Sequence, residues 1–183
     1  MKTLTKLFFA LLIAALFSFT SHAGMRMTVS IVDADKVVTI QRSTALIDKV
    51  LSETNTARAL TLDKAWAGIN FLLNGTNKNA TGPKSWVIFG GKEIGNDLGY
   101  GRARLLTPSE VKQIAAVLKE ETREKLWPRY DPVLMEKSEV YPEDIWIPEG
   151  KEAFDYLMEY YEKLRAFYDR AAQSGSGVVM AIE

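Results

Sequence analysis

A glycine-rich stretch in the middle of the chain holds the densest group of residues that could take part in chemistry. Residues 90–101 contain five glycines in the sequence GGKEIGNDLGYG. This stretch and the residues just after it contribute five candidate side chains: Glu93, Asp97, Tyr100, Arg102 and Arg104. Backbone N–H groups in such a stretch can cradle a phosphate, but the lysine and hydroxyl ending of a P-loop and the Rossmann glycine spacing are both missing. The composition therefore predicts a turn-rich connector whose polar side chains are candidate ligand-binding residues.

A second group lies in the segment 141–146, which reads YPEDIW and contributes the candidates Tyr141, Glu143, Asp144 and Trp146. Two carboxylates beside aromatic rings could hydrolyse a glycoside or stack on a sugar. Adjacent acids rarely face the same way, however, so we interpret Trp146 as a core residue and both acids as solvated. None of the nine candidates in the two groups is predicted to be catalytic, and no metal site is predicted.

A third acidic pair, Asp33 and Asp35, has the spacing of two calcium ligands. A calcium loop also needs further oxygen ligands and a glycine at the turn, and the residues that follow do not supply them. The pair is therefore predicted to cap a short helix, and no cofactor is expected.

The N-terminus has the three parts of a secretory signal peptide. Lys2 and Lys6 are followed by the apolar run 7–17, and small residues precede Gly24 at positions 21 and 23. An eleven-residue run at 1.5 Å per residue covers only about half of a ~30 Å hydrocarbon core, so it is too short for an anchor. We expect cleavage after residue 23, export to the periplasm or beyond the cell, and a single mature domain over residues 24–183.

Removal of residues 1–23 would also remove His22, the sole histidine of a chain that has no cysteine. A Ser-His-Asp triad, a Cys-His pair and the usual zinc or haem ligands would then be unavailable. Without Lys2 and Lys6, 21 of the 23 basic residues remain against 23 acidic ones, which predicts neither nucleic acid nor an anionic membrane surface as a partner.

Periodicity predicts strands at both ends of the mature chain and helices between them. Residues 25–31 alternate as a strand, residues 62–73 and 149–173 show helical spacing, and Thr107 begins a capping box. The long last helix has a main apolar stripe and a second one formed by Tyr156, Tyr160 and Phe167, and the four tryptophans are predicted to be core. We expect an α+β fold: a small sheet that includes both terminal strands, covered by several helices.

Four stretches in their order together resemble the YfbM-like family, a domain of unknown function. They are 62–66 with the ending at 73–75, 99–108, 141–146, and the final helix with 167–168 and 171–172. Arg102 stands where the family pattern leads us to expect proline, and a signal peptide precedes a domain usually seen without one. The resemblance implies an α+β fold and no established activity, so it transfers no catalytic residues.

These features favour an exported, non-catalytic module that binds a protein or a small ligand, with its oligomeric state undetermined. A carboxylate-dependent hydrolase of an envelope sugar or peptide, using Glu93, Asp97, Glu143 or Asp144, is the first alternative. An inhibitor or immunity protein is the second. The arrangement that would best separate these hypotheses is a polar cleft shared by residues 90–104 and 141–146.

Overall fold

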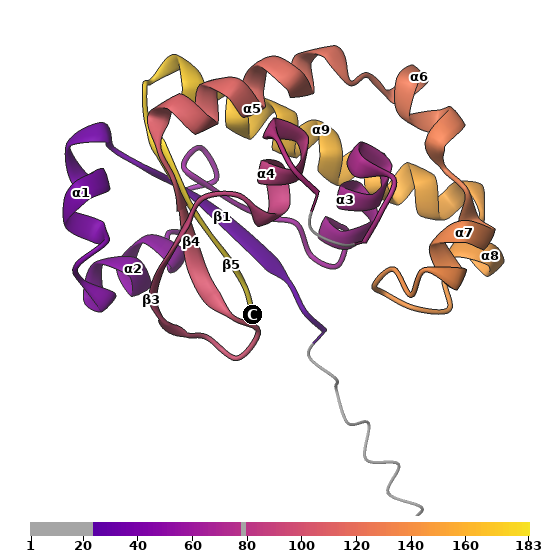
Figure 1. Cartoon of the computed structure of the whole chain (residues 1–183), viewed down its shortest axis with the longest axis horizontal. Helices are drawn as coiled ribbons and strands as arrows, with labels where there is room; N and C mark the ends of the chain where they lie inside the picture. The colour runs from indigo at the N-terminus through magenta and orange to yellow at the C-terminus, as the bar shows by residue number, and fades with distance from the viewer. Residues whose placement is uncertain (1–23, 78–79) are drawn as a thin grey trace, which may run out of the picture.

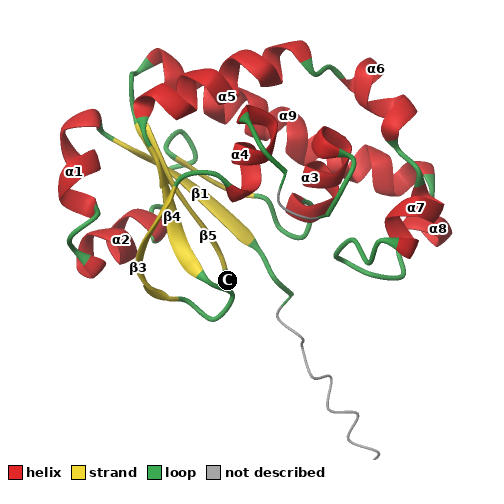
Figure 2. Cartoon of the chain, in the orientation of Figure 1, coloured by secondary structure: helices red, strands yellow, loops and turns green. Residues whose placement is uncertain are grey.

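The computed structural model describes residues 24–77 and 80–183, so the predicted signal peptide lies outside the described residues. A five-stranded antiparallel sheet has the strand order β2-β1-β5-β4-β3 (Figures 1 and 2). The strands are β1 (Met27–Val32), β2 (Ala59–Thr61), β3 (Lys92–Asp97), β4 (Arg102–Leu106) and β5 (Gly177–Ile182). The two terminal strands, β1 and β5, pair along their full length from Met27↔Ile182 to Val32↔Gly177. The predicted α+β fold, with both terminal strands in the sheet, is confirmed.

Helices cover both faces of the sheet. The α-helices are α1 (Val37–Ile40), α2 (Thr44–Leu51), α3 (Trp66–Asn74), α4 (Pro83–Phe89), α5 (Pro108–Glu120), α6 (Arg123–Leu126), α7 (Pro132–Lys137), α8 (Trp146–Glu149) and α9 (Lys151–Gln173). The 3-10 turns are η1 (Ala34–Lys36) and η2 (Trp127–Arg129). Figure 1 shows α1 and α2 on one side of the sheet and the longer helices α5 and α9 on the other. Among the described residues, no helix combines the length and the apolar character that a membrane span requires.

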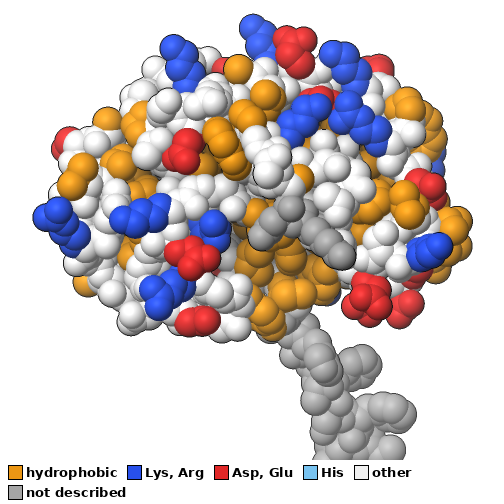
Figure 3. All heavy atoms as spheres, viewed as in Figure 1, with side chains coloured by type: hydrophobic (Ala, Val, Ile, Leu, Met, Phe, Trp, Pro, Cys, Tyr) orange, Lys and Arg blue, Asp and Glu red, His pale blue; other side chains and the backbone are white. Residues whose placement is uncertain are grey.

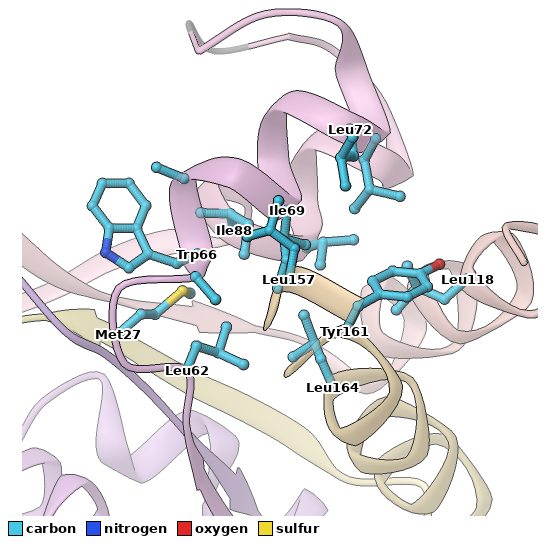
Figure 4. Packing of buried hydrophobic residues seen from close by; sticks show 14 of the residues in the cluster. Met27, Leu62, Trp66, Ile69, Leu72, Ile88, Leu118, Leu157, Tyr161 and Leu164 are labelled. Carbon is cyan, nitrogen blue, oxygen red and sulfur yellow. The ribbon is translucent and has the colours of Figure 1, made fainter. Parts of the chain in front are cut away.

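The larger core lies between the sheet and helices α3, α4, α5 and α9 (Figure 4). Every second residue of β1 points into it, beginning with Met27 and Val29, because side chains alternate along a strand. Trp146 and the rings of Phe154, Phe167 and Tyr168 are fully buried there. The opposite face carries a smaller aliphatic core beneath α1 and α2. Its buried members are Val32, Val37, Ile40, Ile47, Ile94, Ala103, Leu105, Val179 and Ala181.

The long helix α9 follows its predicted spacing. The main stripe is buried and consists of Phe154, Leu157, Tyr161, Leu164, Tyr168 and Ala171. In the second stripe Phe167 is buried, whereas Tyr156 and Tyr160 are half-buried and pack against the large core. Gly150 separates α9 from the short α8, so the helix begins two residues later than predicted.

Two helix ends of the structure carry capping motifs that depend only on neighbouring residues in the sequence. Thr107 and Glu110 form the predicted capping box at the start of α5, with both reciprocal hydrogen bonds present. Gly75 ends α3 in the left-handed conformation (φ 69°). The predicted start of that helix is wrong. Thr61 belongs to β2 and pairs with Thr28, and Asp63 adopts a left-handed turn (φ 47°), so the helix cannot begin before Trp66.

Two further sequence interpretations need correction. The glycine-rich stretch is not only a connector, because residues 92–97 form the edge strand β3, which pairs with β4. Trp127 is not a core residue: 48 % of it is exposed, and its ring stacks on Tyr130 and meets Phe154 edge-on at the surface.

Candidate functional site

A hollow of about 160 Å³ opens on the large-core face of the sheet, beside the C-terminal end of β5. Its apolar part is supplied by the strand residues Met27, Met180 and Ile182 and by Ile88 and Phe89 of α4. Its polar part and its rim consist of Glu93, Tyr100, Arg102 and Arg104. Figure 3 shows hydrophobic side chains gathered on this part of the surface, close to where the described chain begins. The hollow thus contains four of the nine sequence candidates.

Strand register explains why these residues share one face. Met180 lies opposite both Val29 and Arg104, and Arg104 lies opposite Glu93, which gives one row across the sheet. Ile182 lies opposite Met27 in the next row, and Arg102, two residues before Arg104 on β4, lines the hollow beside them. The two rows together form the floor of the hollow.

Arg104 is committed to the fold. Its Nε donates to the Gly90 carbonyl oxygen at 3.0 Å and its Nη2 to that of Gly91 at 3.1 Å. Its Nη1 donates to Oε1 of Glu93 at 2.8 Å. The guanidinium therefore holds the segment that follows α4 against β4 and pairs with the Glu93 carboxylate. Both charged groups are thus engaged in stabilising the fold.

Asp97 shapes the β3–β4 turn. Its Oδ1 accepts the backbone N–H of Gly99 at 2.7 Å and that of Gly101 at 3.3 Å. Both glycines have φ near 110°, a conformation that residues with a Cβ rarely adopt. The carboxylate therefore stabilises a turn and does not line the hollow.

Arg102 and Tyr100 are the uncommitted residues at the rim. Both are exposed, and the ring of Tyr100 is 56 % accessible. The side chain of Arg102 forms no hydrogen bond or ion pair with residues 24–77 or 80–183, although its backbone pairs with Asp97 of β3. Its donors are accordingly available to a ligand.

Tyr141 brings the second sequence group to the margin of the hollow. Its ring stacks on Trp66 at 5.8 Å between centroids, and Trp66 meets Phe89 edge-on at 6.1 Å. Burial raises the pKa of Tyr141, and the nearby Asp63 carboxylate and Tyr100 hydroxyl raise it further. A hydrogen bond from the Met25 backbone acts in the opposite direction and offsets part of this rise in pKa. Tyr141 is thus connected to the hollow through the rings of Trp66 and Phe89, and it does not itself line the hollow.

The other members of the second group do not join the hollow. Trp146 is completely buried, and its Nε1 donates to the Val140 carbonyl oxygen at 2.7 Å, as expected for a core residue. Glu143 and Asp144 are exposed, and Asp144 has a left-handed backbone (φ 63°). Neither acid lines the hollow with Glu93.

Sequence reasoning missed the apolar floor of the hollow. Alternation did indicate that Met27 shares one face of the first strand with Val29 and Ile31. It did not indicate that a hollow remains between α4 and the ends of β4 and β5.

The sequence profile of one protein family, described as Domain of unknown function (DUF1877), matches residues 24–181. The chain belongs to this family. A crystal structure of YfbM from Escherichia coli, a protein of unknown function, is similar with a TM-score of 0.70 and 24 % sequence identity, covering 86 % of this chain and 99 % of that one. Identity at that level supports the shared fold alone. No curated protein matches the chain.

Elsewhere in this DUF1877 chain, a buried carboxylate fastens the helical layer. Glu121 lies at the end of α5 with its side chain 7 % exposed, in contact with the Lys84 ammonium and 2.8 Å from Nη1 of Arg129. Burial alone would raise the pKa of Glu121, but the two cationic partners outweigh it and hold the pKa below its usual value. The Tyr161 hydroxyl donates to the backbone oxygen of Glu121 at 2.6 Å, which ties the cluster to α9.

Asp33, the first acid of the pair near α1 of the DUF1877 domain, is also engaged. The Asp33 carboxylate accepts hydrogen bonds from Nζ of Lys36 at 2.6 Å and from Nη2 of Arg58 at 2.8 Å. These two bonds lower the pKa of Asp33. Asp33 occupies the predicted N-cap position before η1, but its side chain forms no capping hydrogen bond with the backbone. Within the described ranges, no three acidic, histidine or cysteine residues gather as they would around a metal ion.

Proposed function

We propose that this chain is an exported, non-catalytic binding module whose ligand occupies the hollow at the end of β4 and β5. One observation carries the proposal. A ready-made apolar depression on a rigid sheet has an uncommitted arginine, Arg102, at its rim. Sites of this kind, mostly apolar with few polar groups that fix orientation, are the usual form of binding sites.

The size of the hollow limits its occupant. Pockets for drug-sized molecules measure about 300–1,000 Å³, whereas this hollow measures 160 Å³. It has room for one side chain or one ring. The proposal therefore favours a larger partner that inserts a single group over a metabolite enclosed whole.

A carboxylate-dependent hydrolase is supported less well. Such enzymes hold two carboxyl groups roughly 5–9.5 Å apart around the scissile bond. Among the described residues that line the hollow, Glu93 is the only acid, and it is paired with Arg104. An inhibitor or immunity role would use the same hollow as a protein-binding surface and would differ in the identity of the partner.

A fragment screen tests the binding proposal. The protein, isotopically labelled and purified from cells that express the full chain, would be titrated with small aromatic and aliphatic fragments and followed by ¹H–¹⁵N NMR. We expect amide shifts that cluster on 100–104 and 180–182 and that disappear in Ile182→Trp, which fills the hollow. Hits that cluster elsewhere, or that survive the filled hollow, would contradict the proposal.

The export proposal has its own test. The full chain with a C-terminal tag would be expressed in a bacterium, fractionated, and its N-terminus determined by mass spectrometry. We expect a product outside the cytoplasm that begins at Gly24. A chain that keeps residues 1–23 in the cytoplasm would refute export without affecting the binding site.

A further inference from the structure

We infer that the hollow recognises the free carboxyl end of a peptide whose last residue has a large apolar side chain. This inference rests on the proposed function, because it names the ligand of the same site. It combines the charge left free at the rim, the spacing between that charge and the apolar floor, and the volume available.

The charge at the rim selects an anion. Arg104 and Glu93 neutralise one another, and Asp97 uses its carboxylate on two turn amides. Arg102 remains with its five N–H donors unoccupied by the described residues. Asp97 is its cross-strand partner, yet the two side chains form no ion pair, so the guanidinium is free to bind a carboxylate as a planar fork.

The spacing selects a chain end over an internal acidic residue. Arg102 lines the same hollow of about 160 Å³ as the apolar residues Met180 and Ile182. A ligand that fills this hollow and reaches Arg102 must therefore present its carboxylate close to its apolar group. In an extended peptide, neighbouring side chains point to opposite faces. An internal acidic residue therefore cannot reach Arg102 while the next residue along the peptide places an apolar side chain in the hollow. A C-terminal residue carries its carboxylate and its side chain on the same Cα.

The volume and the lining select the side chain. A hollow of 160 Å³ over Met27, Met180 and Phe89 accepts one leucine-sized or phenylalanine-sized group. Tyr100, exposed at the rim, is placed to cover the inserted group and the peptide that leads away from it. Capture of a chain-terminal carboxylate beside a pocket for its side chain is an established mode of peptide recognition.

Two short peptides test the inference, one ending in leucine as the free acid and one of the same sequence as the C-terminal amide. Each would be titrated into the purified protein and followed through the amides of 100–104 and 180–182. We expect the acid to bind at least about tenfold more tightly than the amide, since hydrogen bonds to charged groups exceed those to neutral ones. Arg102→Met should bring the acid to the level of the amide. The matched control is Arg170→Met, because Arg170 is exposed, lies near the opposite end of β5 and forms no ion pair with the described residues; it should change nothing.

The outcomes separate the two proposals. Equal binding of acid and amide, or full binding by Arg102→Met, would overturn the chain-end inference while leaving the hollow as a binding site. Fragment shifts in the hollow without peptide binding would do the same. If neither fragments nor peptides shift the amides around the hollow, the proposed function itself fails.

Discussion

The two faces of the sheet differ in what covers them and in what they leave open. Beneath α1 and α2 the buried cluster is small and wholly aliphatic. On the other face, four helices enclose a core with Trp146, Phe154, Tyr161, Phe167 and Tyr168, all but completely buried. The hollow is also on this second face, between α4 and the ends of β4 and β5.

The contrast indicates where stability and recognition reside. The aromatic face buries most of the apolar surface and contains the buried ionic cluster around Glu121, so it supplies most of the folding free energy. The binding site proposed at its margin would rest on strands of the sheet, which favours a preformed shape. The aliphatic face is an auxiliary layer, and changes in it should cost less.

The largest expected effect comes from removing the central ring of the aromatic face. Trp146→Ala should lower the free energy of unfolding by about 3–5 kcal/mol, because it leaves a cavity and removes the hydrogen bond to Val140. Urea denaturation measures the change. Trp127→Ala, at a ring that is 48 % exposed, should cost clearly less. Equal costs for the two tryptophans would remove the distinction between core and surface rings on this face.

The next effect concerns the buried carboxylate. Glu121→Gln should cost about 2 kcal/mol at pH 7, less than a fully buried pair would, because Lys84 and Arg129 are each more than a third exposed and can turn to water. Glu143→Gln, in an exposed loop, is the control and should be neutral.

The same variant has a defined pH dependence. The folded-state pKa of Glu121 is lowered from 4.5, so its contribution is present above that value and is lost as pH falls through the folded pKa. The stability difference between the native chain and Glu121→Gln should therefore shrink on acidification below about pH 4.5. A difference that stays constant down to pH 2 would mean that the carboxylate charge contributes nothing.

A smaller effect separates the two arginines of β4. Arg104→Met should cost about 1–2 kcal/mol, since two carbonyl oxygens and Glu93 lose their donor. Arg102→Met should change stability by less than about 0.5 kcal/mol, as is usual for surface positions without partners. Thermal and chemical unfolding of both variants would measure this, and a reversed order would contradict the assignment of Arg102 as the uncommitted residue.

The smallest effect sharpens the comparison of the two cores directly. Ile47→Val in α2 and Ile69→Val in α3 each remove one methylene from a buried site, and each should lower the free energy of unfolding by about 0.5–1.5 kcal/mol. We expect the α2 variant near the lower limit, because its smaller cluster relaxes more easily around the lost group. A larger cost for Ile47→Val would show that the aliphatic layer is as tightly packed as the aromatic one.

Much of the fold could be predicted because its signals are local. Alternation identified the first strand, the main stripe identified α9, and Thr107 with Glu110 fixed the start of α5. The edge strand β3 could not be predicted. Its glycine and the bulge between Ile94 and Asp97 break the alternation, and its pairing with β4 is visible only once the turn is formed.

The candidate site was predicted in its polar residues but not in its shape. Loop chemistry drew attention to Tyr100 and Arg102, and both lie at the hollow. Arg104 donates hydrogen bonds to the carbonyl oxygens of Gly90 and Gly91. The sequence did not reveal this, because the contact depends on where α4 ends relative to β4. The depth of the hollow likewise depends on how far the helices extend over the sheet, which is a tertiary property that no single stretch encodes.

The central position of β5 has a consequence for the order in which the molecule is made. Residues 177–182 join β1 to β4, so the two halves of the sheet cannot be connected until the last residues of the chain are available. During synthesis the earlier segments can form helices and the β3–β4 hairpin, but no complete sheet. The complete sheet therefore forms only once residues 177–182 have been synthesised, however early the helices and the hairpin appear.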